Sequence, residues 1–186
     1  MGYLSRQTLV EMGFVHLGKE VTISDKASIY EPEKMSIGDH CRIDDFCVVS
    51  GILNMGRNIH IAAQCLVAGG DAGITFEDFS GLAYHVSVFA QSDDYNGETL
   101  TNPTVPDAYK KEQKAPVFIG RHTIVGSGAV IMPGVRIEEG NSIGALALVT
   151  KSTQPWSIYV GIPAKRVGER QRDMLKLEAE YIKAHP

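Results

Sequence analysis

Two adjacent carboxylates near the middle of the chain are the first residues whose type and spacing suit chemistry. Asp93 and Asp94 lie near the start of a strongly polar segment, residues 91–116, and Tyr95 follows them. A carboxylate can hold an amine in line for attack and stabilise the cation that forms. A free aspartate, with a pKa of about 3.9, is nevertheless a weak base for an alcohol. The alternative is that the pair only caps a turn in a polar loop.

Two adjacent cations form the second such group. Lys165 and Arg166 follow Pro163 near the end of the chain. A Lys ammonium is a point charge and an Arg guanidinium is a planar fork, and both suit phosphate oxygens. Taken alone, the pair fits a phosphate site and the ordinary solvated start of a helix equally well.

Histidines and cysteines offer weaker signals. His85 precedes the polar segment, which itself contains no histidine, and His122 follows it. A lone histidine is more often structural or exposed than catalytic, so His85 is a candidate base with no partner motif. The three cysteines have no zinc-ribbon spacing, and buried thiols acting as small hydrophobes are the favoured interpretation. We therefore expect no metal site.

A six-residue repeat is the element that must position these groups. Apolar side chains recur every six positions in three runs and in one degenerate run near the N-terminus. The runs are Ile37, Ile43, Val49, Met55, Ile61 and Val67; Phe76, Leu82 and Val88; Ile119, Val125, Ile131, Ile137, Ile143 and Val149; and the degenerate Ile23, Ile29 and Met35. A period of six fits neither an α-helix nor a simple hairpin.

Short strands joined by tight turns explain this period. They would wind as a three-sided prism with about 18 residues per coil, and the coils would satisfy one another's backbone. Small residues such as Gly126 and Gly144 follow the apolar ones and suit the crowded corners. Cys47 and Cys65 share a repeat position and should stack on neighbouring coils. The predicted fold class is an all-β solenoid of about five coils.

The repeat also divides the chain into parts. A long loop inserted into a regular solenoid is more often functional than idle. We expect residues 1–186 to form a single domain with an inserted loop and a C-terminal α-helix. We expect a short helix at residues 5–12 and a final helix at about 169–184. The prism is expected in two blocks, 20–90 and 117–155, with the loop at 91–116 between them.

Composition excludes several classes of protein. The chain is 44% hydrophobic and 22% charged with a net charge of -4, so it has no basic face for nucleic acid. No segment approaches the ~18 apolar residues that span a membrane. No secretory signal is visible, so we expect a cytoplasmic protein. The 19 glycines and the low aromatic content of 8% agree with many turns around a thin interior.

The repeat and two longer segments resemble a known family. The sixfold runs, VGSGAVIMPGVRIEEGNSIGALALVTKS (125–152) and VGIPAKRVGE (160–169), resemble the hexapeptide-repeat acyltransferases. They are similar to the branch that contains galactoside, maltose and xenobiotic acetyltransferases. The resemblance covers about residues 20–170. It implies a left-handed parallel β-helix and a homotrimer with active sites between subunits. It also implies acetyl-CoA, or another short acyl-CoA, in a groove between two prisms.

Cofactor positions of the family carry over to matching residues. The resemblance implies that small residues after the repeat position meet the pantetheine arm and that later polar residues meet the adenosine and phosphates. These residues are Ser127 and Ala145 for the arm, Thr150 and Lys151 near the adenosine, and Lys165 and Arg166, after Pro163, for the phosphates.

The expected acceptor follows from a missing histidine. Relatives that acetylate hydroxyls usually carry a catalytic histidine where this sequence has Asp93 or Asp94. An amine needs less help, because it attacks as the neutral base and loses its surplus proton afterwards. The chain is similar to N-acyltransferases of nucleotide-linked amino sugars, some of which have an acidic residue here. This implies acetyl transfer to an amino sugar in surface-polysaccharide or lipopolysaccharide biosynthesis. Asp94 or Asp93 would bind the amine, and His85 and Tyr95 would contact the acceptor.

Three alternatives remain open. In the first, the enzyme is an O-acetyltransferase that acts on a sugar hydroxyl with His85 as base. In the second, it is a zinc lyase of the γ-carbonic anhydrase type, although no two of its histidines have the five-residue spacing of that site. In the third, it is a non-catalytic solenoid, which leaves the inserted loop and segment 160–169 unexplained.

Overall fold

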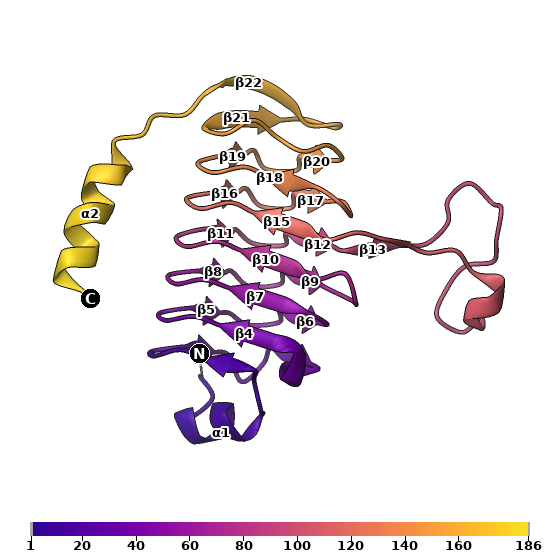
Figure 1. Ribbon diagram of the computed structural model, residues 1–186, viewed down its shortest axis with the longest axis horizontal. Helices are drawn as coiled ribbons and strands as arrows, with labels where there is room; N and C mark the ends of the chain where they lie inside the picture. Colours follow the sequence, from indigo (N-terminus) through magenta and orange to yellow (C-terminus); the bar gives the residue numbers. More distant parts are fainter. Residues whose placement is uncertain (1, 186) are drawn as a thin grey trace.

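Three parallel sheets wound around one axis build most of the protein. The computed structural model describes residues 2–185, and its strands stack into a prism that carries one long lateral loop (Figure 1). We name the sheets the first, second and third faces, in the order in which the chain visits them. From β1 to β21, successive prism strands belong to different faces and pair in parallel with their equivalents one coil away, whereas β22 folds back antiparallel to β21 on the second face.

The bounds of the elements follow this order. The first face contains β1 (His16–Leu17), β4 (Met35–Ile37), β7 (Leu53–Met55), β10 (Ile74–Phe76), β15 (Val117–Ile119) and β18 (Arg136–Ile137). The second contains β2 (Thr22–Ile23), β5 (Arg42–Ile43), β8 (His60–Ile61), β11 (Gly81–Leu82), β16 (Ile124–Val125), β19 (Ser142–Ile143), β21 (Ser157–Val160) and β22 (Lys165–Glu169). The third contains β3 (Ser28–Tyr30), β6 (Val48–Ser50), β9 (Leu66–Ala68), β12 (Ser87–Phe89), β17 (Val130–Ile131) and β20 (Leu148–Val149).

Elements outside the prism are few. They are α1 (Arg6–Glu11), the 3-10 turns η1 (Pro32–Lys34) and η2 (Asp107–Tyr109), the strand pair β13 (Gln91–Ser92) and β14 (Gln113–Lys114), and α2 (Met174–Ala184). Ser5 caps α1 by accepting a hydrogen bond from the backbone N–H of Thr8 at 3.1 Å, as expected for a helix N-cap. No helix within residues 2–185 is long and apolar enough to cross a membrane.

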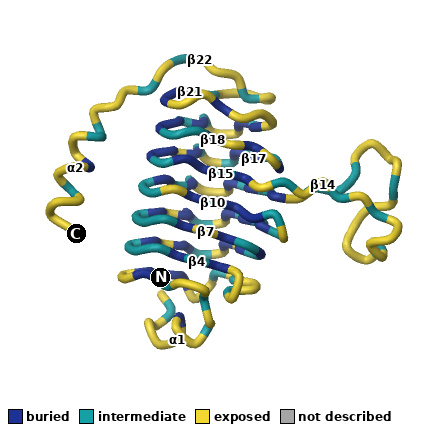
Figure 2. Tube along the Cα trace, in the orientation of Figure 1, coloured by how far each residue is buried: buried dark blue, intermediate teal, exposed yellow. Residues whose placement is uncertain are grey.

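The six-spaced side chains form the core. Side chains alternate between the two sides of a strand, so each short strand points one or two residues into the prism. On the second face Ile43, Ile61 and Leu82 occupy equivalent register positions on three coils, and all three are buried. Figure 2 shows buried residues along every coil, whereas α1, α2 and the loop are mostly exposed. The predicted prism is therefore confirmed.

The corners depend on unusual backbone angles. His85 and Leu146 have φ values of 61° and 59° at the corner between the second and third faces. Gly128 occupies the same position on the coil between them with a φ of 70°. A Cβ there would meet Leu146 Cδ2 at 2.7 Å, so glycine avoids both strain and a clash.

The stacked cysteines behave as predicted. Cys41, Cys47 and Cys65 are buried free thiols. The Cys47 thiol donates to the carbonyl of Ala62 at 3.1 Å, and the Cys65 thiol donates to that of Ala83 at 3.1 Å. Each thiol therefore caps a carbonyl of the next coil inside the prism.

The prism is taller than predicted. The first and third faces each have six strands, and β21 begins a further coil, so the expected number of about five is too low. The six-residue pattern is weak in the first coil, and the predicted prism ends at Pro155. In fact Leu17 pairs in register with Ile37, and β21 pairs in register with β19.

The C-terminal helix begins later than predicted. Residues 165–169 form β22, antiparallel to β21, and α2 starts only at Met174. Arg170 gives the reason, because its guanidinium nitrogen donates to the carbonyls of His122, Gly140 and Asn141 at 2.6, 3.2 and 3.0 Å. These bonds hold the chain against the corner between the first and second faces, so it cannot turn into a helix there.

Candidate active site

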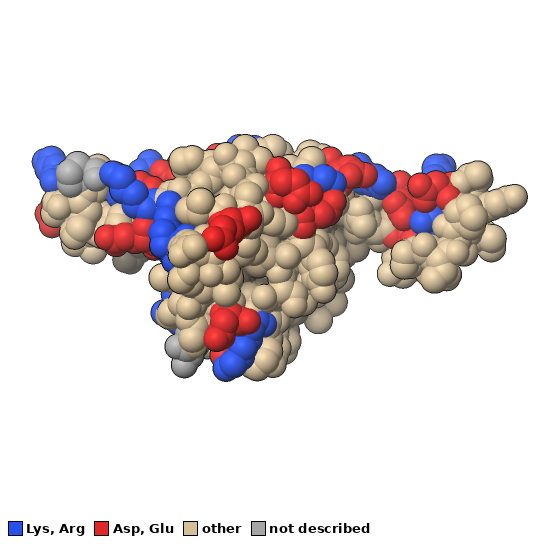
Figure 3. Space-filling view, turned by 90° about the horizontal axis from the view of Figure 1, so that it is seen from below, with Lys and Arg blue, Asp and Glu red and all other residues tan. Residues whose placement is uncertain are grey.

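The inserted loop leaves the prism at the corner between the third and first faces. Strands β13 and β14 pair antiparallel and form a stalk that carries the loop well away from the prism, opposite α2 (Figure 1). The loop predicted at 91–116 matches this segment closely. Seen from the N-terminal end, charged side chains gather on the loop, on α2 and at a few sites between them, and much of the central surface is uncharged (Figure 3).

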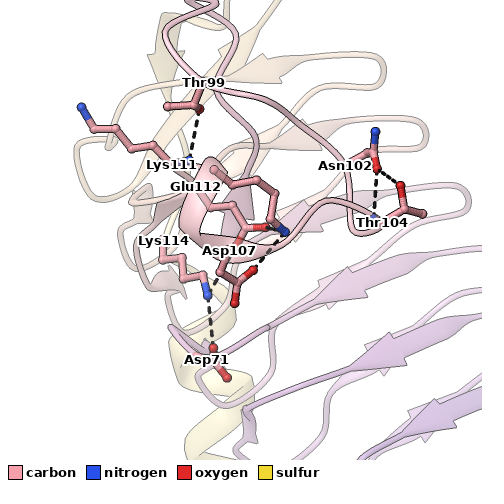
Figure 4. Close-up of polar contacts among 9 residues, drawn as sticks. Asp71, Thr99, Asn102, Thr104, Asp107, Lys111, Glu112 and Lys114 are labelled. Atoms are coloured by element: carbon pink, nitrogen blue, oxygen red, sulfur yellow. Dashed lines mark hydrogen bonds and ion pairs between the residues drawn. The ribbon is translucent and has the colours of Figure 1, made fainter.

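Ion pairs fix the stalk (Figure 4). Lys114 Nζ lies 3.3 Å from a carboxylate oxygen of Asp71, which belongs to the turn beside the stalk. Lys110 Nζ lies 3.2 Å from Asp107 and 3.2 Å from Glu112, and its side chain is only 7% exposed. The hydrogen bond with Asp107 is the main reason that the pKa of Lys110 is raised. The loop therefore has its own charged framework.

Asp94 works within this loop as a turn cap. Its carboxylate accepts hydrogen bonds from the backbone N–H of Asn96 and of Thr99, both at 2.8 Å, and from the Thr99 hydroxyl at 3.1 Å. The N–H of Asn96 is the main cause that lowers the pKa of Asp94. A carboxylate held in this way is a still weaker base, so the turn-capping alternative describes Asp94 in this structure.

Asp93 has different surroundings. It lines a pocket of about 540 Å³ between the stalk and the third face. The pocket has an apolar floor from the third face and a largely polar rim from β13 and the loop that follows it. Its lining is Ala68, Phe89, Val130 and Met132, with Gln91, Ser92, Asp93, Tyr95, Pro103 and Glu112. Of the two adjacent carboxylates, Asp93 is therefore the one that faces a ligand-sized space.

Glu112 is the pocket residue that sequence reasoning missed. It enters from the far end of the loop, and Lys110 and Lys114 both pair with it, at 3.2 and 3.4 Å. A signal did exist, because both ends of an inserted loop must return to the same corner of the prism. Residues just before its end therefore lie beside residues just after its start.

His85 lies apart from the carboxylates. It is exposed and precedes β12, whereas Asp93 comes after both β12 and β13. A three-residue strand is about 10 Å long, so the width of the third face separates the two residues. The structure thus does not bring all three predicted catalytic residues together within one chain.

The predicted pantetheine residues share the His85 corner. Ser127 and Ala145 are exposed on successive coils, and the N–H of Leu146 donates to the Ser127 carbonyl at 2.9 Å. The N–H of Gly128 in turn donates to the carbonyl of Tyr84, which precedes His85. The corner between the second and third faces is therefore a continuous exposed edge, parallel to the prism axis.

The predicted phosphate residues lie near the top of this edge. Pro163 and Lys165 are exposed in and beside the turn between β21 and β22. Arg166 is held by its own hairpin, because its Nε donates to the Ser157 hydroxyl at 2.9 Å and one terminal nitrogen lies 3.3 Å from Glu169. Thr150 and Lys151 are also exposed but follow β20, at the opposite end of that strand. Lys165 is thus the cation best placed above the edge.

Metal ligation finds no support in the described part of the chain. Among residues 2–185 no group of three or more His, Cys, Asp or Glu side chains is arranged to hold a metal ion.

Comparisons with known proteins agree on one relationship. The family described as "Bacterial transferase hexapeptide (six repeats)" matches residues 116–151. The dTDP-4-amino-4,6-dideoxy-D-glucose acyltransferase of Escherichia coli is 40% identical over 184 residues, which are 97% of this chain and 95% of that protein. A chloramphenicol acetyltransferase of Morganella morganii is 46% identical over 66 residues, 34% of this chain and 31% of that protein.

Solved structures extend the comparison. AntD, an N-acyltransferase from Bacillus cereus, has been solved as a variant in complex with dTDP and coenzyme A. It is 40% identical, covers 99% of this chain and 100% of its own, and has a TM-score of 0.97. Another AntD variant, 41% identical over 98% of each chain, contains dTDP-4-amino-4,6-dideoxyglucose and coenzyme A and also has a TM-score of 0.97. A maltose O-acetyltransferase from Clostridium difficile, at 21% identity and a TM-score of 0.60, shares the fold.

Proposed function

This chain belongs to the hexapeptide-repeat acyltransferase family, and we propose that it acylates the amino group of a deoxy amino sugar linked to a nucleoside diphosphate. The acyl donor is an acyl-CoA. One observation carries the proposal, namely 40% identity across 97% of the chain to an acyltransferase of dTDP-4-amino-4,6-dideoxy-D-glucose. The AntD complexes, which hold coenzyme A with that amino sugar, support the same pairing of substrates.

Amine chemistry fits the pocket residues. A neutral amine attacks the thioester carbonyl, a C–N bond forms, and the C–S bond breaks as coenzyme A leaves. The nitrogen loses one proton, which balances the charge of the departing thiolate. Asp93 supplies a carboxylate at the pocket, where it can orient the amine and stabilise its positive charge after attack. Asp94 holds the turn that carries Asp93, and Tyr95, on the same rim, contacts the acceptor.

The site needs a second copy of the chain. The loop corner and the exposed edge with Ser127 and Ala145 lie on opposite sides of the third face, so one chain cannot close a site around both substrates. A homotrimer would place the loop of one subunit against the edge of the next. The third face supports such contacts, because apolar side chains point outward along it. They include Val48, Leu66, Phe89, Val130, Met132 and Leu148.

Coenzyme A would then run along that edge. Ser127 and Ala145 offer a narrow surface for the pantetheine arm, and Lys165 lies above them for the phosphates. Arg166, Thr150 and Lys151 complete the donor site we propose, with Pro163 shaping the turn. Residues 1–186 act as one domain in this scheme. The dTDP-linked substrate of the E. coli relative supports a cytoplasmic role in making surface-polysaccharide sugars.

A hydroxyl acceptor is the second candidate. His85 is exposed on the same corner as Ser127, so it could reach an acceptor beside the donor thioester. In that scheme His85 removes the proton from a sugar hydroxyl, and the loop carboxylates have no part in the chemistry.

An assay of thiol release separates the two candidates. Purified protein is given acetyl-CoA or 3-hydroxybutyryl-CoA with dTDP-4-amino-4,6-dideoxyglucose, and in parallel with maltose. We expect turnover with the amino sugar alone. Turnover with maltose alone, abolished in His85→Ala, would reject the N-acyl proposal. Glu98→Gln, a change at an exposed carboxylate of the same loop, is the matched control and should keep full activity.

A further inference from the structure

A polar cluster on the second face is not used by the site described above. Arg42 Nε donates to Asp44 Oδ1 at 2.6 Å, and His60 Nε2 lies 2.8 Å from Asp44 Oδ2. The Asp44 side chain is only 6% exposed, whereas those of Arg42 and His60 are 46% and 49% exposed. One buried carboxylate therefore holds two exposed nitrogen-bearing groups side by side on the surface.

The exposed polar atoms of this cluster are nitrogens. Burial raises the pKa of Asp44, but hydrogen bonds from Arg42 and His60 outweigh it and leave the pKa below its usual value. An ionised carboxylate only accepts, so His60 must donate through Nε2. Its other ring nitrogen, Nδ1, is then the atom that a ligand meets. Because both Asp44 oxygens are engaged and covered, the accessible surface of the cluster consists of Arg42 and His60.

One position above the cluster carries no side chain. On the second face Arg42, His60, Gly81 and Ile124 are register partners on successive coils, and their positions point outward. Gly81 is a glycine, so no side chain stands between those of His60 and Ile124. Tyr84, which is 57% exposed, follows β11 at the adjacent corner. The Tyr3 ring lies 5.8 Å from the Arg42 guanidinium carbon.

The position of the cluster along the prism axis places it a short distance from the level at which the amine is acylated. The loop leaves the coil of β10, β11 and β12, so the amine must react near the level of β11. His60 and Arg42 lie one and two coils below β11, which is about 4.8 and 10 Å at the usual strand spacing. A three-fold axis along the prism would keep these heights the same in every subunit. A hexose ring is about as wide as one strand spacing, ~4.8 Å.

We propose that Arg42 and His60, held by Asp44, bind the diphosphate of the nucleotide-linked acceptor. The inference rests on the proposed function and adds the subsite that selects a nucleotide-linked sugar over a free sugar. With the amine at the level of β11 and the hexose spanning one coil, the diphosphate falls at the level of β8 and β5. Arg42 offers a planar fork for phosphate oxygens, and an imidazolium at His60 would donate through Nδ1 while Nε2 stays on Asp44.

Coenzyme A also contains a diphosphate, but its proposed place is elsewhere. Lys165 lies on β22, beyond β21, and β21 is four strands above β8 on the second face, about 19 Å away at the usual spacing. The acyl-CoA therefore extends from β22 toward β11, and the nucleotide-linked amino sugar extends from β5 toward β11. The thioester and the amine meet near β11. The two diphosphates occupy opposite ends of the groove.

Binding measurements without turnover test the subsite. Titration calorimetry is carried out with dTDP, UDP, GDP, thymidine and coenzyme A separately on wild type, Arg42→Gln and His60→Asn. Loss of a hydrogen bond to a charged group predicts that each variant binds dTDP about 10- to 100-fold more weakly. Thymidine, which has no phosphate, should lose nothing, and coenzyme A should bind within about twofold of wild type.

The chain contains a matched control on another face. Arg136 Nε donates to Glu138, two residues later, at 3.0 Å, and its guanidinium carbon lies 4.9 Å from the Phe118 ring. Arg42 makes equivalent contacts, with the carboxylate of Asp44 two residues later and with the Tyr3 ring. Arg136→Gln therefore controls for the loss of an arginine–carboxylate pair on the prism surface. It should leave dTDP binding unchanged.

Each other outcome overturns the proposal in a recognisable way. Unchanged dTDP binding in both variants rejects the subsite while the proposed function stands. Weakened binding of coenzyme A instead of dTDP assigns the cluster to the donor. If wild type binds neither dTDP nor UDP or GDP, the nucleotide-linked acceptor is wrong, and the subsite is rejected with it. Equal loss of thymidine and dTDP would indicate a merely structural role.

Discussion

Helix α2 should detach from the prism when Glu178 is replaced by alanine. Glu178 is the one buried residue of this helix and contacts both Arg121 and His122. Its side chain is 7% exposed and that of His122 is 6% exposed, at 3.1 Å from carboxylate oxygen to ring Nε2. Tyr181 adds a hydroxyl that accepts from Asn58 Nδ2 at 2.9 Å.

The magnitude follows from this burial. Removing one partner of a buried pair costs about 3–5 kcal/mol because the other partner stays buried without compensation. Arg121 is 38% exposed, and water screens its share, so we take the lower end, about 3 kcal/mol. At about 1.4 kcal/mol per factor of ten, the open population of α2 should rise roughly 100-fold. The prism has its own core, so its unfolding midpoint should shift little.

Native-state hydrogen exchange measures this local opening directly. Amides of α2 should lose protection by roughly two orders of magnitude in Glu178→Ala, while amides of β7 and β10 keep theirs. Glu180→Ala, at an exposed position of the same helix, is the matched control and should behave as wild type. Unchanged α2 protection in Glu178→Ala would show that the Glu178 contacts do not hold the helix on the prism. Equal loss of protection in α2 and the prism would show that the helix is part of the global folding unit.

Three further predictions concern the site and the prism. Asp93→Asn should lower kcat by about 10²–10³ with a KM for acyl-CoA within a few-fold of wild type, in steady-state kinetics; an unchanged kcat would remove Asp93 from the chemistry. Because the pKa of Asp44 is lowered on balance by Arg42 and His60, its contribution to stability is present above the pKa of an unfolded aspartate, about 3.9, and is lost as pH falls through the lower folded value. Acid unfolding should therefore show a stability difference between wild type and Asp44→Asn that shrinks below pH ~4, and a constant difference would contradict the assignment. Burial raises the pKa of Cys41 to about 11, so a thiol reagent at pH 8 should label it only as fast as the protein unfolds, as mass spectrometry can follow. Rapid labelling of the folded protein would contradict its burial.

The fold was accessible from the sequence because its signal is local. Between Ile119 and Val149 a buried Ile or Val recurs every six residues. That period alone is enough to predict short strands around a narrow core. The coil count was less accessible. Residues 16–30 carry a weaker pattern, and they are held in register by the coil above rather than by their own periodicity.

The C-terminal helix shows a different limit. The composition of residues 169–184 is helical throughout, yet Arg170 is engaged by three carbonyls from two other coils. Propensity is a weak prior, and tertiary contacts override it where they satisfy several backbone groups at once. No local pattern could have located this boundary.

We could predict the prism, the position of the inserted loop, the stacked cysteines and the acyltransferase relationship from the sequence. All of these depend on periodicity or on contiguous motifs. Only the tertiary structure separated Asp93, which lines the pocket, from Asp94, which caps a turn, although the two are neighbours. It also brought Glu112 to the stalk and Arg42 next to His60, eighteen residues later. The physical reason is that burial and hydrogen bonds depend on which coils and turns meet in space, and residue type alone does not encode that.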